Sequence, residues 1–284
     1  MTKVKPYVYY DEKYPTHWIS RNVTKQIKEF LEKEGFQVIN ANELEKLITE
    51  TIRKTSDTEI VIVFSHDAVP SMILDNETNP TINSPLRQFL NKGHSVVWLG
   101  DIPLLHIGFE DGRKQSLSAN VCQNVLGLNP NPPFVKYKVN MTLYGMMYNL
   151  PEWIGTRPHT GVSSGIRLTS LAQSRHENHT IHHAFIISYT NKRLSGFIRL
   201  YDFPLKEPLN KEFLKAIYNL AIFRNPLQPI YQRLQALENK VEQLNNRIET
   251  KFNTLKNELD NIKELINKIL ELKKMEKEAN SIEK

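Results

Sequence analysis

The chain has 284 residues, of which 40% are hydrophobic, 24% charged and 9% aromatic, and its formal net charge is +6. This composition is typical of a globular protein and excludes wholesale disorder, a collagen-like chain and a disulfide-rich scaffold. A single cysteine, Cys122, cannot form an intrachain disulfide, which indicates a reducing compartment. No apolar run reaches the roughly 20 residues that span a bilayer, and the N-terminal segment lacks the apolar stretch of a secretory signal. We therefore expect a cytoplasmic protein with no membrane partner.

The distribution of glycine and proline divides the chain into a globular body, residues 1–223, and a tail, residues 224–284. No glycine follows Gly196 and no proline follows Pro229. From Pro226 onward, 11 basic and 10 acidic residues nearly cancel, so the body carries the remaining charge of +5. The basic residues of the body are scattered, whereas nucleic-acid-binding domains cluster them on one face. Weak nucleic-acid binding therefore stays only as an alternative hypothesis.

The first hundred residues are predicted to alternate strands and helices. The expected strands are residues 5–10, 36–40, 58–64 and 94–100. Helices are expected up to Lys33, after an N-cap at Asn42 with Glu45 closing a capping box, and between Ser84 and Gly93. The apolar run 58–64 is typical of a parallel strand that is buried on both faces. These elements predict an α/β fold with a doubly wound, mainly parallel sheet of flavodoxin-like type.

The second half of the body has a different pattern. Residues 134–144 alternate in hydrophobicity, which predicts a strand at an edge or in a hairpin. Residues 182–189 and 195–202 are expected to form two strands joined by a turn at 191–193. A helix over 211–223 is expected to close the body.

The tail carries the apolar spacing of a coiled coil. From Ile230, apolar residues recur at alternating steps of four and three, and a four-residue stutter between Ile248 and Phe252 joins two such series. The residues of this seam are Ile230, Leu234, Leu237, Val241, Leu244, Ile248, Phe252, Leu255, Leu259, Ile262, Ile266 and Ile269. A helix of this length is roughly 80 Å long, so most of it is expected to project and to pair with other copies of the chain. The spacing leaves the number and orientation of the helices open.

The order of elements, with a late strand reading GFIRLYD (196–202), resembles the class I glutamine amidotransferase-like superfamily. Within it, the chain is most similar to the branch that holds ThuA-like proteins and the accessory domain of some β-galactosidases. The resemblance covers about residues 5–223 and depends on IVIVFSHDAVP (60–70) and SVVWLGDIPL (95–104). It implies an amidotransferase-like fold.

The chain departs from that superfamily at the catalytic nucleophile. Its catalytic members carry a cysteine in a sharp turn after a central strand, but the matching turn here contains Gly100 and Asp101. Cys122 lies in a segment with a helical pattern, among apolar residues, and is expected to be an ordinary buried cysteine. Without an activated nucleophile the amidotransferase mechanism is not available, which favours a protein that is not an enzyme.

Polar residues follow several of the expected strands and define a candidate crevice. They are Asp11, Ser65, His66, Asp67, Gly100 and Asp101. The carboxyl ends of parallel strands meet at one edge of a sheet, where open α/β folds bind their ligands. The set could act as an acid–base pair or hold a divalent metal. The alternative is that these side chains only cap the following helices and turns.

A histidine-rich segment, His176–His183, invites a metal-site hypothesis because imidazole is a common ligand. Neighbouring strand residues point to opposite faces, however, and no HExxH spacing occurs. We therefore expect no cofactor and no metal site.

The leading hypothesis is a non-catalytic, amidotransferase-like scaffold or ligand-sensing module that forms homo-oligomers through its coiled coil. The competing hypothesis is a hydrolase, acting for example on a carbohydrate, that uses Asp67, Asp101 and His66. A further protein partner is compatible with either hypothesis.

Overall fold

The computed structural model of the chain describes residues 3–118, 120–129, 135–192 and 194–282. Contacts between residues divide the chain into two compact units, Met1–Pro229, which is called the body from here on, and Ile230–Lys284. Phe134 and Arg193, which belong to an expected strand and an expected turn, lie outside the described residues.

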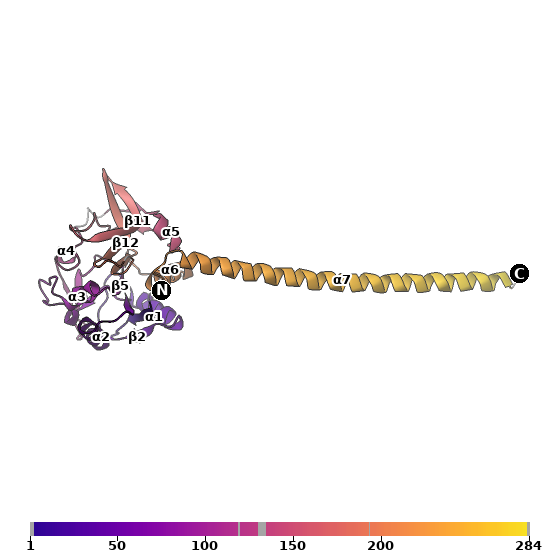
Figure 1. Ribbon diagram of the computed structural model, residues 1–284, viewed down its shortest axis with the longest axis horizontal. Coiled ribbons are helices and arrows are strands. Elements are labelled where there is room, and N and C mark those ends of the chain that lie inside the picture. Colours follow the sequence, from indigo (N-terminus) through magenta and orange to yellow (C-terminus); the bar gives the residue numbers. More distant parts are fainter. Residues whose placement is uncertain (1–2, 119, 130–134, 193, 283–284) are drawn as a thin grey trace. The chain divides into compact units, whose positions relative to one another are not determined.

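An eight-stranded sheet forms the centre of the body, in the order β2-β1-β3-β5-β13-β12-β11-β9 (Figure 1). Its strands are β1 (Val4–Tyr9), β2 (Gln37–Ile39), β3 (Glu59–Phe64), β5 (Ser95–Leu99), β9 (Asn140–Met141), β11 (Arg167–His176), β12 (His179–Ser188) and β13 (Phe197–Leu200). The strands from β2 to β13 in that order are parallel, and those from β12 to β9 pair antiparallel. The prediction of an α/β fold with a largely parallel sheet is confirmed at this level, and the complete sheet is mixed.

The antiparallel half confirms one prediction and corrects another. The expected hairpin is present as β12 and β13, with Ile186 opposite Ile198. The continuous strand expected over 134–144 is wrong in extent, because only Tyr137–Lys138 (β8) and β9 are strands there. The hydroxyl of Thr142 accepts a hydrogen bond from the amide of Gly145 at 3.3 Å and caps a short helix, so the chain turns instead of continuing as a strand. The strand β9 does lie at the edge of the sheet.

Shorter strands and the helices complete the two units. Two small sheets contain β8 with β10 (Ile154–Gly155), and β4 (Val69–Pro70) with β6 (His106–Gly108) and β7 (Lys114–Ser116). The helices are α1 (Arg21–Lys33), α2 (Ala41–Arg53), α3 (Pro85–Asn91), α4 (Val121–Leu126), α5 (Leu143–Met147), α6 (Lys211–Ile222) and α7 (Gln228–Ile282), with a 3-10 turn at Ser71–Ile73.

The N-cap of α2 is Asn40, which corrects the expectation of Asn42. The Asn40 side chain accepts from the amide of Glu43 at 3.0 Å, and the Glu43 carboxylate accepts from the amide of Asn40 at 2.9 Å. This capping box begins the helix directly after β2. Two Asn-x-x-Glu spacings overlap in this segment, and the shorter strand β2 leaves the first of them at the helix start.

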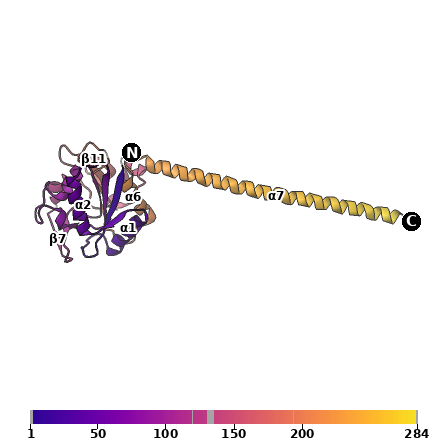
Figure 2. The ribbon, with the colours of Figure 1, turned by 60° about the horizontal axis from the view of Figure 1, so that its bottom comes forward.

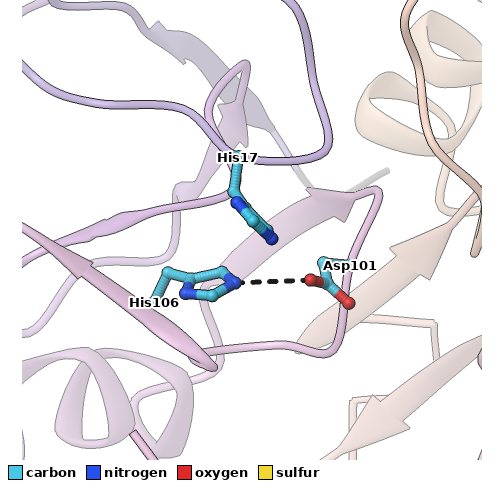
Figure 3. A group of neighbouring side chains, drawn as sticks. All are labelled: His17, Asp101 and His106. Atoms are coloured by element: carbon cyan, nitrogen blue, oxygen red, sulfur yellow. Dashed lines mark ion pairs between the residues drawn. The ribbon is translucent and has the colours of Figure 1, made fainter. Parts of the chain in front are cut away.

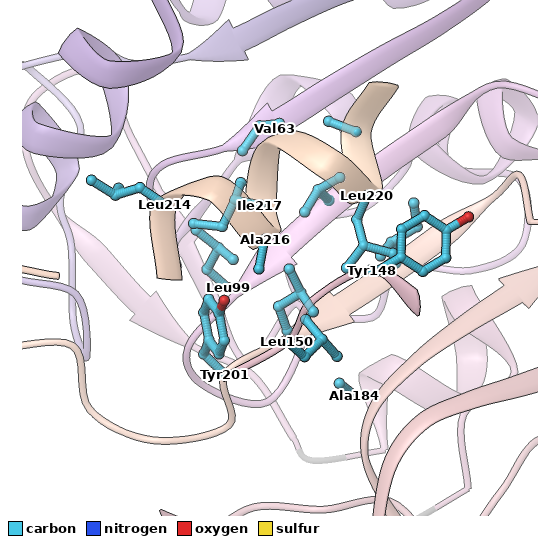
Figure 4. Packing of buried hydrophobic residues seen from close by; sticks show 14 of the residues in the cluster. Val63, Leu99, Tyr148, Leu150, Ala184, Tyr201, Leu214, Ala216, Ile217 and Leu220 are labelled. Atoms are coloured by element: carbon cyan, nitrogen blue, oxygen red, sulfur yellow. The ribbon is translucent and has the colours of Figure 1, made fainter. Parts of the chain in front are cut away.

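Helices cover both faces of the sheet because successive strand residues point to opposite sides. Val61 and Val63 pack in one hydrophobic cluster with α1 and α6, whereas Ile62 and Phe64 pack in the other with α2, α3 and α4. Figure 4 shows the first cluster, in which Ala216, Ile217 and Leu220 of α6 pack close to the strand residues Val63 and Leu99. The continuous apolar strands are thus explained by burial on both faces.

A buried ion pair joins the end of the body to the amino-terminal end of β3. The Nε of Arg224 donates to both carboxylate oxygens of Glu59 at 2.8 Å. Glu59 is fully buried and also accepts hydrogen bonds from Ser95 at 2.6 Å and Ser195 at 3.2 Å. The two serine hydroxyls thus satisfy the remaining lone pairs of the Glu59 carboxylate, which is the condition for a buried ion pair to be tolerated.

The second unit contains all but the first two residues of α7, a helix of 55 residues that begins at Gln228 (Figures 1 and 2). The twelve seam residues expected from the sequence are all on this helix, and their exposed fractions range from 43% at Ile230 to 67% at Phe252. The helix therefore presents an apolar stripe that the described part of one chain does not cover.

Candidate functional site

The carboxyl ends of β1, β3, β5 and β13 share one edge of the sheet because these strands are parallel. The expected residues after β1, β3 and β5 are present there, and β13 adds Asp202 at the same edge. Asp67, Asp101 and Asp202 are each fully buried. This edge is the candidate functional site.

Asp11, Ser65 and His66 have structural roles and do not face the buried carboxylates. The Asp11 carboxylate accepts from the amide of Ala41 at 3.1 Å, the first residue of α2, and Ser65 donates to the carbonyl of Tyr9 at 2.6 Å. His66 accepts from the amide of Asp11 at 3.3 Å. Burial lowers the pKa of His66 to about 4, so the ring is neutral at physiological pH. The acid–base pairing of His66 with Asp67 or Asp101 is therefore not supported by the geometry.

Asp67 holds the loop that follows β1. Its carboxylate accepts hydrogen bonds from the backbone amides of His17, at 2.8 Å, and Trp18. Burial raises the pKa of Asp67. The nearby charge of Asp101 also raises it, whereas the two hydrogen bonds lower it. Asp67 thus places His17 at the site and does not itself point outward.

Three side chains from three segments converge at this edge: His17, Asp101 and His106 (Figure 3). One ligand atom from each lies within 4.8 Å of the other two. The Nε2 of His106 is 3.4 Å from the Oδ2 of Asp101. His17 is exposed, whereas Asp101 is fully buried and His106 is 5% exposed.

Local backbone geometry explains how Asp101 and His106 meet. Gly100 follows β5 with a φ of +83°, a conformation that favours glycine, and the chain turns there. The carboxylate of Asp101 then accepts from the amide of Ile102 at 2.7 Å. The chain returns as β6, whose first residue is His106, and pairing with β7 places Ser116 opposite it. The Nδ1 of His106 is 3.1 Å from the Ser116 hydroxyl, which fixes the orientation of the ring.

Cationic groups surround the cluster. Arg157 lies 3.5 Å from the Oδ1 of Asp101 and its guanidinium stacks 4.7 Å from the centre of a Trp18 ring. The ammonium of Lys114 is 2.6 Å from the Nδ1 of His17. Burial alone would raise the pKa of Asp101, but the contact with His106, the hydrogen bond from Ile102 and the charge of Arg157 hold it below its ordinary value. Partial burial, His106 and Lys114 lower the pKa of His17.

Asp202 forms a second buried polar group that the sequence analysis missed. It accepts from the indole of Trp153 at 2.8 Å and from the amide of Arg157 at 3.0 Å, and the Nδ1 of His183 is 2.7 Å away. The fully buried Arg199 donates to the carbonyl of Arg157 at 2.6 Å. The sequence does contain a signal for Asp202. If residues 195–202 are assigned to the parallel sheet, Asp202 is one of the residues that follow the carboxyl end of a strand.

The other sequence candidates are placed away from the cluster. Cys122 is buried in α4, and burial raises the pKa of its thiol to about 11, so it is no activated nucleophile. The histidines of 176–183 are dispersed, since His176 contacts Tyr137, His182 contacts Ser170 and His183 contacts Asp202. Among the residues that the structure describes, His17, Asp101 and His106 are the one group with metal-ligand geometry.

The described helices include none that is both long enough and apolar enough to cross a membrane. A family model described as the MJECL34 family matches residues 4–224. The uncharacterized protein MJECL34 of Methanocaldococcus jannaschii is 43% identical over 244 residues, which cover 84% of this chain and 80% of that protein. The matched range 4–224 includes every residue of the candidate site and ends before α7.

Proposed function

The chain belongs to the MJECL34 family, and we propose that it is a non-catalytic, amidotransferase-like ligand-binding module that assembles into homo-oligomers through α7. The observation that carries this proposal is the uncovered apolar stripe of α7. The single cysteine of the chain, Cys122, is buried and unpaired, which supports a cytoplasmic location.

The stripe on α7 requires a partner for a physical reason. Its twelve apolar side chains recur at heptad spacing and are between 43% and 67% exposed in the single chain. Hydrophobic burial is worth roughly 25 cal/mol per Å², and a helix with such a stripe gains this free energy only by packing against another surface. A second copy of α7 offers a surface with the same periodicity.

Charges beside the seam favour a parallel arrangement of the copies. With Leu234 and Leu237 at positions a and d, Arg233 occupies g and Glu238 occupies e of the next heptad. In a parallel coiled coil these positions face each other across the interface. Glu258 and Lys263 repeat this pairing after the stutter.

The residues at the expected nucleophile position support the non-catalytic part of the proposal. The turn after β5 contains Gly100 and Asp101 where amidotransferase-like enzymes carry a cysteine, and one oxygen of Asp101 is held by Ile102 and Arg157. The strand order from β2 to β13 supports the flavodoxin-like and amidotransferase-like assignment of the body.

The test is the oligomeric state, measured by light scattering. The double variant Leu237→Lys and Leu244→Lys is expected to be monomeric, because each lysine would be buried at a d position of the seam. The matched control is Asn239→Lys and Asn246→Lys, which adds the same charge at outer f positions and is expected to keep the assembly. A truncation after Pro229 is expected to give a folded monomer. Should the seam variant keep the stoichiometry of the unmodified chain, the proposal of assembly through α7 is wrong.

A hydrolase remains the second candidate, and the contact between Asp101 and His106 favours it. An aspartate beside an imidazole is a recurring acid–base arrangement. Turnover of a carbohydrate or ester substrate that is abolished by Asp101→Asn, in a variant that unfolds at an unchanged temperature, would replace the non-catalytic proposal with this one.

A further inference from the structure

Two buried polar atoms at the candidate site have no well-formed hydrogen bond to any described residue: the Oδ2 of Asp101 and the Nε2 of His106. Leaving such groups unsatisfied in a protein interior is unfavourable, by about 1–3 kcal/mol for a neutral group and more for a charged one. The two atoms face each other at 3.4 Å, and the exposed ring of His17 points toward them (Figure 3). The arrangement therefore has the features of a ligand shell.

We propose that His17, Asp101 and His106 bind one divalent transition-metal ion. The sequence analysis noted that the crevice with Asp101 could hold a divalent metal but expected no metal site, and the inference changes that expectation. It rests on the proposed ligand-binding role of this edge, and it identifies the ligand.

The geometry matches the coordination preferences of such an ion. Zinc takes imidazole nitrogen and carboxylate oxygen at roughly 2.0–2.2 Å in tetrahedral sites, so two of its ligands lie roughly 3.4 Å apart. That is the distance between Asp101 Oδ2 and His106 Nε2. The three ligand atoms lie within 4.8 Å of one another, so a shift of the exposed His17 ring supplies the third protein ligand of the ion. Two imidazoles and one carboxylate suit transition metals better than the oxygen-seeking ions Ca²⁺ and Mg²⁺.

Neighbouring residues already orient the three ligand residues through hydrogen bonds and an ion pair. Ser116 holds the Nδ1 of His106 at 3.1 Å, which directs Nε2 toward Asp101. The amide of Ile102 and Arg157 hold the other oxygen of Asp101, which leaves Oδ2 for the ion. Asp67 anchors the amide of His17 at 2.8 Å. Partners of this kind raise metal affinity by roughly 10–100-fold in characterised sites.

Lys114 opposes the ion in the structure as it stands. Its ammonium lies 2.6 Å from the Nδ1 of His17 and donates to it, so the ring proton of the neutral imidazole is on Nε2. Binding the ion through Nε2 requires this proton to be on Nδ1 and Lys114 to give up its acceptor. Lys114 is thus a competitor of the ion, which yields a gain-of-affinity test.

The experiment is calorimetric titration of the full-length chain, first treated with EDTA and then dialysed, with Zn²⁺ alone as the probe. The expected stoichiometry is one ion per chain. Asp101→Asn and His106→Gln are each expected to weaken binding at least about tenfold. Lys114→Met is expected to tighten zinc binding several-fold. The matched control is His179→Gln, which alters an exposed histidine outside the group and is expected to leave the zinc affinity unchanged.

Cobalt provides a second readout, because the visible absorption of bound Co²⁺ reports its coordination geometry and is expected to change in His17→Gln. Melting curves of the metal-free variants show whether each is folded, and Lys114→Met keeps the test informative if Asp101→Asn does not fold. Less than one ion per chain, unchanged affinity in His106→Gln, or weaker binding in Lys114→Met would each overturn the inference. Because assembly is measured independently by light scattering, a chain that oligomerises and binds no zinc rejects the metal site alone.

Discussion

The Nδ1 of His183 lies 2.7 Å from the Oδ2 of Asp202, and both side chains are fully buried. Asp202 follows the parallel strand β13, whereas His183 comes from its antiparallel neighbour β12. The pair therefore joins the two halves of the mixed sheet at the edge that holds the candidate site.

Removing this carboxylate is expected to destabilise the body strongly. Asp202→Ala would leave the Trp153 indole, the Arg157 amide and His183 without their acceptor, so the free energy of unfolding should fall by about 3–5 kcal/mol. Asp202→Asn keeps one acceptor oxygen and should lie between this value and zero. Urea denaturation measures both. The control is Asp111→Ala, an exposed aspartate bonded to Arg113, for which a change within about 0.5 kcal/mol is expected; an equal effect of the two alanine variants would contradict the assigned role of Asp202.

Gly155 is predicted to tolerate no side chain. A Cβ at this position would lie 2.1 Å from the Nδ1 of His183 and 2.7 Å from the Oδ1 of Asp202, both held by hydrogen bonds. Gly155→Ala should therefore destabilise the chain by about 3 kcal/mol or more. For comparison, Gly165→Ala meets nothing within 4 Å and adds only the strain of a φ of +81°, about 1–2 kcal/mol. Thermal unfolding that ranks the two variants in the opposite order would reject the packing at Gly155.

His94 is expected to make stability depend on acidic pH. It is buried and accepts from the amide of Ile60 at 3.1 Å, and burial lowers its pKa from 6.5 to about 4. The folded state therefore favours the neutral ring, so its contribution is complete above about pH 6.5 and is lost as the pH falls toward 4. The loss is at most about 3 kcal/mol for a pKa difference of this size.

His94→Asn retains an acceptor for Ile60 but cannot take up a proton, so it is the matched variant. Denaturation between pH 7 and pH 4 should show a shallower decline for His94→Asn than for the unmodified chain. Some decline should persist because the pKa of His66 is also lowered to about 4 by burial. Identical pH profiles would show that His94 does not titrate as stated.

The capping box of α2 gives a direct test of one correction. Asn40→Ala should destabilise the chain by about 1 kcal/mol because the amide of Glu43 loses its acceptor. Asn42→Ala, at the position favoured by sequence alone, should change stability by less than about 0.5 kcal/mol. Chemical denaturation distinguishes them, and a larger effect at Asn42 would place the cap where the sequence analysis expected it.

The parallel half of the fold could be predicted because local sequence patterns determine its strands and helices. The strand of residues 59–64 is apolar on both faces, and the helices beside it begin and end at Ser, Asn, Pro and Gly residues with clear local roles. The strand β11 could not be identified this way. Its residues Arg167, Thr169 and Gln173 are polar, and pairing with β12 rather than hydrophobic pattern holds them in the sheet.

The sequence analysis and the structure place the candidate site at the same edge of the sheet, but they group different residues there. Asp101 was identified because it directly follows a strand, whereas His106 and His17 are brought to it by β6–β7 pairing and by Asp67, which are contacts between segments distant in sequence. The hydrolase hypothesis grouped His66 with Asp67 and Asp101. In the fold, its ring instead accepts from Asp11 and serves the loop after β1.

The ion pair between Glu59 and Arg224 fixes the position at which the end of the body meets the sheet. Glu59 begins β3 and Ser65 follows its last residue, so Arg224 is fastened at the amino-terminal edge of the sheet, roughly 20 Å from the opposite edge for a strand of this length. Asn225 follows Arg224 at that edge. A fluorophore or surface tether joined at Asn225 is therefore attached to the body at the edge of the sheet opposite to Asp101 and His106.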